Sequence, residues 1–174
     1  MTVVTGRLGS EHIQYMLTGS MAGNYYAVPR MTRDIDIVVE VASADAGRVC
    51  ALFESDFYVD RDAVAEAIAS RGVFNIIHQA YLLKVDFIVR KDTEYRRVEF
   101  ARRRRASVEG HAFSIVTAED LIISKLDWAR DSRSESQLAD VRNLVASIPD
   151  LDRAYLEQWT ERLGLGDAYR EVIG

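Results

Sequence analysis

Two apolar segments of strand length each carry aspartates. They read DIDIVVEV, residues 34–41, and LLKVDFIV, residues 82–89. Side chains two residues apart on a strand point to the same face, so Asp34 and Asp36 project together while the intervening isoleucines enter the core on the other face. A carboxylate among isoleucines and valines is costly unless a partner compensates its charge. The pattern therefore predicts two core strands that hold acids for a cationic partner.

The rest of the chain divides into a strand-rich part and a helical part. Before residue 117 we expect strands and two helices, and after it the hydrophobic period becomes 3.6 residues. Thr117 and Asp120 resemble a capping box at that change. We expect an α+β (α/β) fold, with a sheet domain in residues 1–116 and a C-terminal helical bundle in residues 117–174 packed on it. The predicted strands lie in EHIQYMLTGS, DIDIVVEV, the hairpin VFNIIHQ and YLLKVDFIVR, and HAFSIV, and the two helices lie in SADAGRVCALFESD and RDAVAEAIASRG.

Composition narrows the class of protein. The 174 residues are 48% hydrophobic with a net charge of −5, so they can bury a core but offer no general attraction for nucleic acid. The single cysteine, Cys50, excludes an internal disulfide framework, and no Cys/His spacing indicates zinc. The N-terminal stretch has no apolar core of signal-peptide length, and no segment has the length of a membrane span. We expect a soluble, cytoplasmic protein without a membrane partner.

A third acid and a Gly-Ser turn complete a candidate site. If the strand of Asp86 neighbours that of Asp34 and Asp36, three carboxylates meet at one edge of the sheet, a donor set suited to Mg²⁺ or Mn²⁺. Gly19 and Ser20 end the preceding strand, where backbone N–H groups could approach a phosphate closely. Gly-Ser alone reads as an ordinary capped turn, and Asp-x-Asp alone as a surface strand. Their joint occurrence favours a site for a metal-bound triphosphate.

These segments resemble a known family. TGSMAGNYYAVPRMTRDIDIVVEV, LLKVDFIV and TAEDLIISKLDWARDSRSESQLADVRNLV resemble the nucleotidyltransferases of the DNA polymerase β superfamily, most closely AbiEii-type toxins of bacterial toxin–antitoxin systems. The resemblance implies a small mixed β-sheet flanked by helices. It also implies that an NMP moves from an NTP to a hydroxyl, with release of pyrophosphate and with Mg²⁺ or Mn²⁺ as cofactor. The implied site residues are the metal-binding and catalytic acids Asp34, Asp36 and Asp86, the phosphate turn Gly19 and Ser20, and Lys125 near the triphosphate.

Four basic residues are candidates for nucleotide binding. Arg30 and Arg33 could grip phosphates, or be solvated loop charges or a carboxylate partner for Asp34. Lys84 shares the face of Asp86 by the period of two, so it could balance the acids or touch the nucleotide. Lys125, at the edge of its helix's apolar stripe, could lean toward the sheet or be a surface lysine.

The acceptor is less defined than the nucleotide. The run RRVEFARRRR, residues 96–105, could hold an RNA acceptor such as tRNA, or be a solvated element neutralised by neighbouring acids. The sequence supports two functions. One is an active transferase that modifies RNA or protein, which could be a toxin restrained by an antitoxin. The other is a non-catalytic binding partner of the same fold in a toxin–antitoxin pair.

Overall fold

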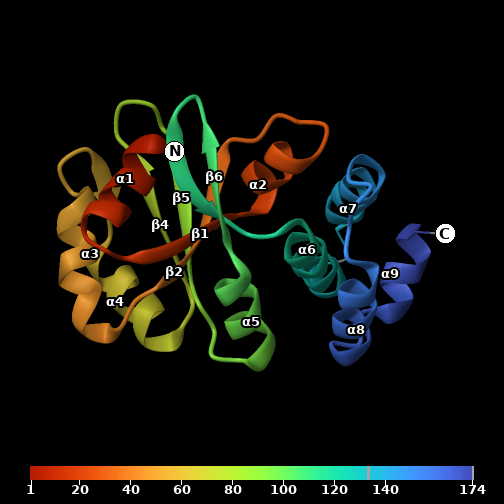
Figure 1. Cartoon of the computed structure of the whole chain (residues 1–174). Coiled ribbons are helices and arrows are strands. Elements are labelled where there is room, and N and C mark those ends of the chain that lie inside the picture. The colour runs from red at the N-terminus through yellow and green to blue at the C-terminus, as the bar shows by residue number, and fades with distance from the viewer. Residues whose placement is uncertain (133, 174) are drawn as a thin grey trace.

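The computed structural model describes residues 1–132 and 134–173 and contains one mixed sheet with helices on both faces (Figure 1). Residues 133 and 174 of the predicted helical segment lie outside the described residues. The strands are β1 Gln14–Thr18, β2 Asp34–Glu40, β3 Phe57–Val59, β4 Val73–His78, β5 Lys84–Val89, β6 Arg104–Val108 and β7 His111–Ile115. The helices are α1 Thr2–Ser10, α2 Gly19–Tyr26, α3 Ala46–Phe53, α4 Arg61–Ser70, α5 Glu94–Arg102, α6 Ala118–Ser132, α7 Glu135–Ser147, α8 Arg153–Arg162 and α9 Gly166–Ile173, with a short 3₁₀ turn, η1, at Ser43–Asp45.

The strand order is β3-β4-β5-β2-β1-β7-β6, so the two acid-bearing strands, β2 and β5, are neighbours near the centre of the sheet. They run parallel, whereas β1 and β4 pair antiparallel to β2 and β5 respectively. The predicted α+β (α/β) class with a mixed sheet flanked by helices is confirmed. The predicted hairpin of residues 73–90 is also confirmed, as β4 and β5.

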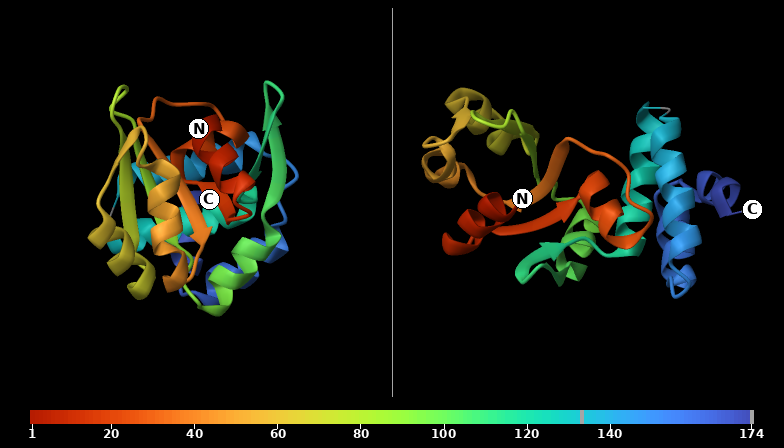
Figure 2. Two further views of the ribbon diagram at one scale, coloured as in Figure 1. Left: turned by 90° about the vertical axis from the view of Figure 1, so that its left-hand side faces the viewer. Right: turned by 90° about the horizontal axis from the view of Figure 1, so that it is seen from above.

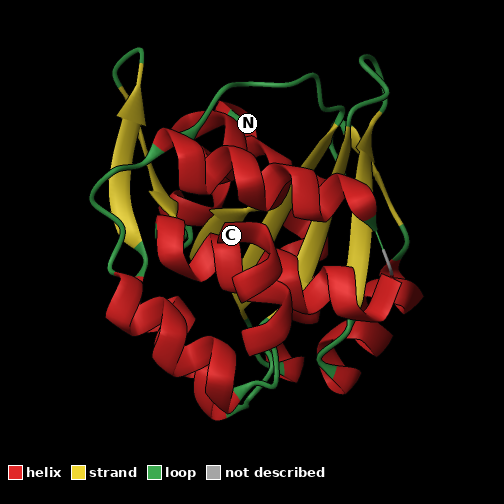
Figure 3. Ribbon diagram, turned by 90° about the vertical axis from the view of Figure 1, so that its right-hand side faces the viewer, coloured by secondary structure: helices red, strands yellow, loops and turns green. Residues whose placement is uncertain are grey.

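The alternation in β2 and β5 separates a core face from a site face. Ile35 and Ile37 of β2 and Phe87 of β5 are at most 3% exposed and pack on the side of the sheet covered by α1, α3 and α4 (Figure 2). Phe53 of α3 lies against Phe87, with ring centroids 5.5 Å apart. The opposite face carries the acids and looks toward α6 to α9, which lie in front of the strands in Figure 3. The period-two pattern therefore directs the acids away from the core.

The C-terminal helices form the predicted bundle around α6. The predicted capping box is present in part: the Asp120 backbone N–H donates to Thr117 Oγ1 at 3.2 Å, whereas Asp120 Oδ2 accepts from the Thr117 hydroxyl, at 2.7 Å, instead of from the Thr117 backbone N–H. Asp120 is completely buried and also accepts hydrogen bonds from Tyr95 of α5, Arg102 of α5 and Tyr155 of α8. This network joins α5, α6 and α8 and compensates the cost of burying a carboxylate.

The last strand ends at Ile115 and α6 starts at Ala118, on either side of the boundary predicted from the sequence. Because α2 packs against both α6 and α7, the helical segment contacts the sheet part directly. The division into two domains remains a prediction. No helix in the described ranges is both long and apolar enough to span a bilayer.

Candidate active site

The three predicted acids lie on one face of two adjacent strands. Asp36 pairs in register with Asp86, and Asp34 pairs with Lys84, so all four side chains project from the same side of the sheet. Neighbouring strands are about 4.8 Å apart, which brings the backbones of Asp36 and Asp86 that close together. We call Asp34, Asp36 and Asp86 the acid cluster. The expectation that their strands neighbour each other is confirmed.

Lys84 supplies a positive charge within the acid cluster. Its Nζ lies 2.8 Å from Asp86 Oδ2 and 3.8 Å from Asp34 Oδ1. The hydrogen bond with Asp86 is the main reason that the pKa of Lys84 is raised. Within the described residues, no three acidic, histidine or cysteine side chains are gathered closely enough to hold a metal ion as they stand. The Lys84 ammonium thus balances the acids in this arrangement.

The environment of Asp36 opposes its ionised form. Burial raises the pKa of Asp36, and the negative charges of Asp86 and Asp34 raise it further. Both effects disfavour the ionised carboxylate, so a cation bound beside it would offset them. Of the three acids, Asp36 alone lines the adjacent cavity.

Gly19 allows the turn before α2 to touch Asp36. Its φ is +63°, and a Cβ built on it would lie 1.9 Å from Asp36 Oδ2. Only a residue without a side chain permits both that conformation and that approach. Thr18, which precedes Gly19, pairs in register with Asp36 on the neighbouring strand. The sheet therefore places the predicted phosphate turn directly beside the acid cluster.

Ser20 and Lys125 are held by the same carboxylate network. Lys125 is only 4% exposed, and its Nζ donates to Asp140 Oδ2 at 2.7 Å and to Gln137 Oε1 at 3.0 Å. Arg30 pairs with both oxygens of Asp140, at 2.8 and 2.9 Å, and also donates to Ser20 Oγ at 2.7 Å. The alternative of Lys125 as a surface lysine is therefore wrong, and the carboxylate that Arg30 contacts is Asp140.

Asp140 and Gln137 were not singled out from the sequence. Both lie on α7, far along the chain from the strands, and the only available signal was that Asp140 sits between the apolar positions Leu138 and Val141 of the predicted helix face. Arg33, a predicted nucleotide ligand, is exposed and does not line the cavity. Its role as a ligand remains a prediction.

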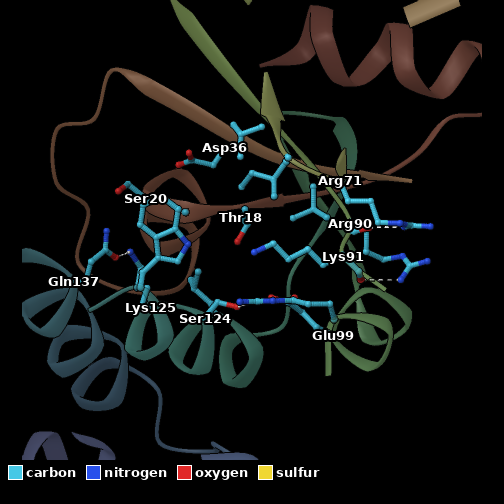
Figure 4. A pocket seen from close by; sticks show the side chains of 18 residues that line it. Thr18, Ser20, Asp36, Arg71, Arg90, Lys91, Glu99, Ser124, Lys125 and Gln137 are labelled. Atoms are coloured by element: carbon cyan, nitrogen blue, oxygen red, sulfur yellow. Dashed lines mark hydrogen bonds and ion pairs between the residues drawn. The ribbon is translucent and has the colours of Figure 1, made fainter. Parts of the chain in front are cut away.

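A cavity of about 300 Å³ extends from this turn between the sheet and α6. Figure 4 shows Asp36, Ser20, Lys125 and Gln137 toward one end and Arg71, Arg90 and Lys91 toward the other. Its apolar lining comes from both sides, with residues of β2, β4 and β5 facing residues of α6. They are Val38, Val73, Ile88, Leu121 and Trp128. The shape and lining suit a ligand with a polar end and an apolar middle.

The arginine run of residues 96–105 is mostly engaged within the protein. Four of its six arginines donate hydrogen bonds to neighbouring side chains, and Arg104 lies over the ring of Tyr26, 4.9 Å from its centroid. The pairs are Arg96 with Glu99, Ser124 and Asp127, Arg97 with Asp92, Arg102 with Asp120, and Arg103 with Gln14. Neutralisation by neighbouring groups therefore accounts for most of this run.

Several solved structures share the fold of this chain. An antigenic nucleotidyltransferase-like protein from Paracoccidioides brasiliensis superposes with a TM-score of 0.59 at 19% identity, over 85% of this chain and 73% of that one. The antibiotic-resistance factor ANT(2″)-Ia gives 0.59 at 14% identity, over 98% and 88%. The lincosamide antibiotic adenylyltransferase LnuA gives 0.57 at 12% identity, over 83% and 94%.

The chain has the nucleotidyltransferase fold. At these identities the likeness concerns the fold alone, since no family model matches the sequence and no curated protein does either. Membership of the AbiEii-type branch remains a prediction.

Proposed function

We propose that this protein is a metal-dependent nucleotidyltransferase that moves an NMP from an NTP to a hydroxyl acceptor and releases pyrophosphate. The observation that carries the proposal is the packing of Gly19 against Asp36, because it unites the phosphate turn and the acid cluster in one site. Among the structural neighbours, LnuA is an adenylyltransferase and ANT(2″)-Ia has been solved with an adenylylated antibiotic, which supports the same type of transfer here.

The acid cluster fits Mg²⁺ or Mn²⁺ by its chemistry. Its donors are carboxylate oxygens, which these ions prefer, and burial together with the charges of Asp86 and Asp34 raises the pKa of Asp36. Asp34, Asp36 and Asp86 would hold the ion after Lys84 moves away from Asp86. When bound, the metal would polarise the phosphates and neutralise charge on the departing pyrophosphate.

The chain's own residues then bind and orient the reactants. The Ser20 hydroxyl and the backbone N–H groups at the start of α2 would hold the terminal phosphates, while Lys125 adds a positive charge at the wall of the cavity. Asp86 would orient the acceptor hydroxyl and accept its proton. The acceptor oxygen forms a bond to the α-phosphorus as the bond from that phosphorus to pyrophosphate breaks.

An RNA or protein acceptor and a toxin paired with an antitoxin are supported by the sequence resemblance alone. ANT(2″)-Ia has been solved with adenylyl-2″-tobramycin and LnuA with lincomycin, so small-molecule acceptors occur on this fold. One observation favours the alternative of a non-catalytic binding partner. The Lys84 ammonium pairs with the acid cluster and balances the acids that would otherwise hold a metal ion.

The test is transfer from each α-labelled NTP, with Mg²⁺ or Mn²⁺, into RNA, protein and small-molecule fractions of a cell extract. We expect label with the natural chain and none with Asp36→Asn. The matched control is Asp150→Asn, an exposed acid between α7 and α8 outside the cavity, which should transfer normally. Absence of label with every NTP from folded protein would refute the transferase and favour the binding partner.

A further inference from the structure

The end of the cavity opposite the acid cluster carries an excess of positive charge. Arg90 is paired with Glu40 through both oxygens and also contacts Asp92. Arg71 donates to the backbone oxygen of Arg90 at 2.7 Å. Asp92 is bound by Arg97 and Arg90 and interacts with the charge of Arg71 only at longer range, and neither Arg71 nor Lys91 forms a direct ion pair in the described part of the chain. Two cations therefore remain available to a ligand at this end. We call Arg71 and Lys91 the basic pair.

The distance from the acid cluster to this end follows from the sheet. Asp86, Ile88 and Arg90 succeed one another at every second position along β5, and Arg90 directly follows its last residue. Asp86 and Arg90 are therefore roughly 13 Å apart at their Cα atoms by strand rise. Ile88 pairs in register with Val38 on one side and Val73 on the other, so an apolar row separates the two charged ends.

The polar end of the cavity already accounts for the anionic part of a nucleotide. In the proposed function, Gly19, Ser20 and Lys125 hold the triphosphate, and the rest of an NTP is an uncharged nucleoside. A nucleobase can accept hydrogen bonds from Arg71 or Lys91, but an uncharged nucleoside cannot neutralise their two positive charges. An anion that neutralises the basic pair would therefore come from the other reactant.

Resting on the proposed function, we infer that the acceptor carries an anionic group, such as a phosphate or a carboxylate, roughly 13 Å from the hydroxyl that is modified, as the strand rise from Asp86 to Arg90 indicates. That group contacts the basic pair, and a flat or apolar portion lies over Val38, Val73 and Ile88. The attacking hydroxyl then lies at the acid cluster. The acceptor of this protein therefore differs from a polycationic small molecule, because the basic pair would repel positive charge.

The test uses 1-naphthyl phosphate as a probe, with uncharged 1-naphthol as its comparison, in titration calorimetry of the whole chain. We expect the phosphate to bind and the naphthol to bind far more weakly. Arg71→Gln with Lys91→Gln should weaken binding of the phosphate by about tenfold or more, since it removes two charged donors. The control is the double variant Arg105→Gln with Arg142→Gln. It removes the same two positive charges at exposed positions outside the cavity, so it should leave binding of the phosphate unchanged. Equal weakening in both double variants, or no binding to the natural chain, would overturn the inference.

A second titration separates this inference from the proposed function. The natural chain is saturated with an NTP and Mg²⁺ before the naphthyl phosphate is added. Binding of both together supports an acceptor site, whereas displacement of the probe would assign the basic pair to the nucleotide and overturn the inference. If the NTP does not bind at all while the probe still depends on the basic pair, the transferase fails and the anion site stands by itself.

Discussion

Replacing Gly19 by alanine should damage the site and the fold together. The new Cβ would lie 1.9 Å from Asp36 Oδ2, and separations under 3.0 Å do not occur for real Cβ atoms, so Asp36 would have to retreat by about 1.1 Å. A misplacement of about 1 Å can cost about 10²-fold in rate. The φ of +63° adds the cost of a left-handed conformation in an L-residue, about 1–2 kcal/mol. We expect Gly19→Ala to lose roughly 1–3 kcal/mol of unfolding free energy in total.

The matched control lies in the same helix. A Cβ on Gly23 meets nothing within 4 Å and Gly23 has no positive φ, so Gly23→Ala should stabilise the protein by about 0.4–1 kcal/mol. Urea unfolding of both variants gives the two changes in free energy, and calorimetry gives the affinity for NTP with Mg²⁺. The same chemical change four residues apart should thus have opposite effects on stability.

Either of two results would refute this reasoning. If Gly19→Ala unfolds at the same urea concentration as the natural chain, the close approach of α2 to Asp36 is wrong. If it is destabilised but binds NTP with Mg²⁺ and transfers label normally, Asp36 is not part of the nucleotide site.

Three further predictions concern charged and polar partners. Lys84→Met removes the ammonium within the acid cluster, so Mn²⁺ affinity measured by electron paramagnetic resonance should rise roughly threefold to tenfold, and an unchanged affinity would mean that Lys84 does not compete with the ion. Asp140→Asn should cost about 2 kcal/mol of unfolding free energy near neutral pH, because Asp140 pairs with the buried Lys125. Burial tends to raise the pKa of Asp140, but the hydrogen bonds of its basic partners outweigh it and lower the pKa, so its contribution is present above the ordinary value of 3.8 and lost as the pH falls through the lowered pKa. Urea unfolding at several pH values should therefore show the gap between the natural chain and Asp140→Asn closing only in acid, and a gap independent of pH would contradict the assignment. Tyr155→Phe removes a 2.6 Å hydrogen bond to the buried Asp120 and should cost about 1–2 kcal/mol in thermal unfolding, whereas an unchanged melting temperature would show that the network does not hold α8.

The strands and helices with strong periodicity were predictable, and several short or polar ones were not. The alternation of Asp34 to Val39 identified β2 and its two faces, and the pair Thr117 and Asp120 located the start of α6. By contrast, α5 has a polar sequence whose burial depends on partners such as Asp127 of α6, and the three-residue strand β3 is defined only by pairing with β4. Local patterns carry no information on such distant partners.

The sequence by itself determined which residues could form the candidate site, because strand period and turn chemistry are local properties. It placed Asp34 and Asp36 on one face and put a glycine where the chain turns into α2. Only the tertiary structure decided that β5 lies beside β2 in a register that sets Asp86 opposite Asp36. It alone brought α7 against Lys125 and set a basic pair at the far end of the cavity. These pairings join residues widely separated in the chain, so they depend on strand order and helix packing that no local pattern encodes.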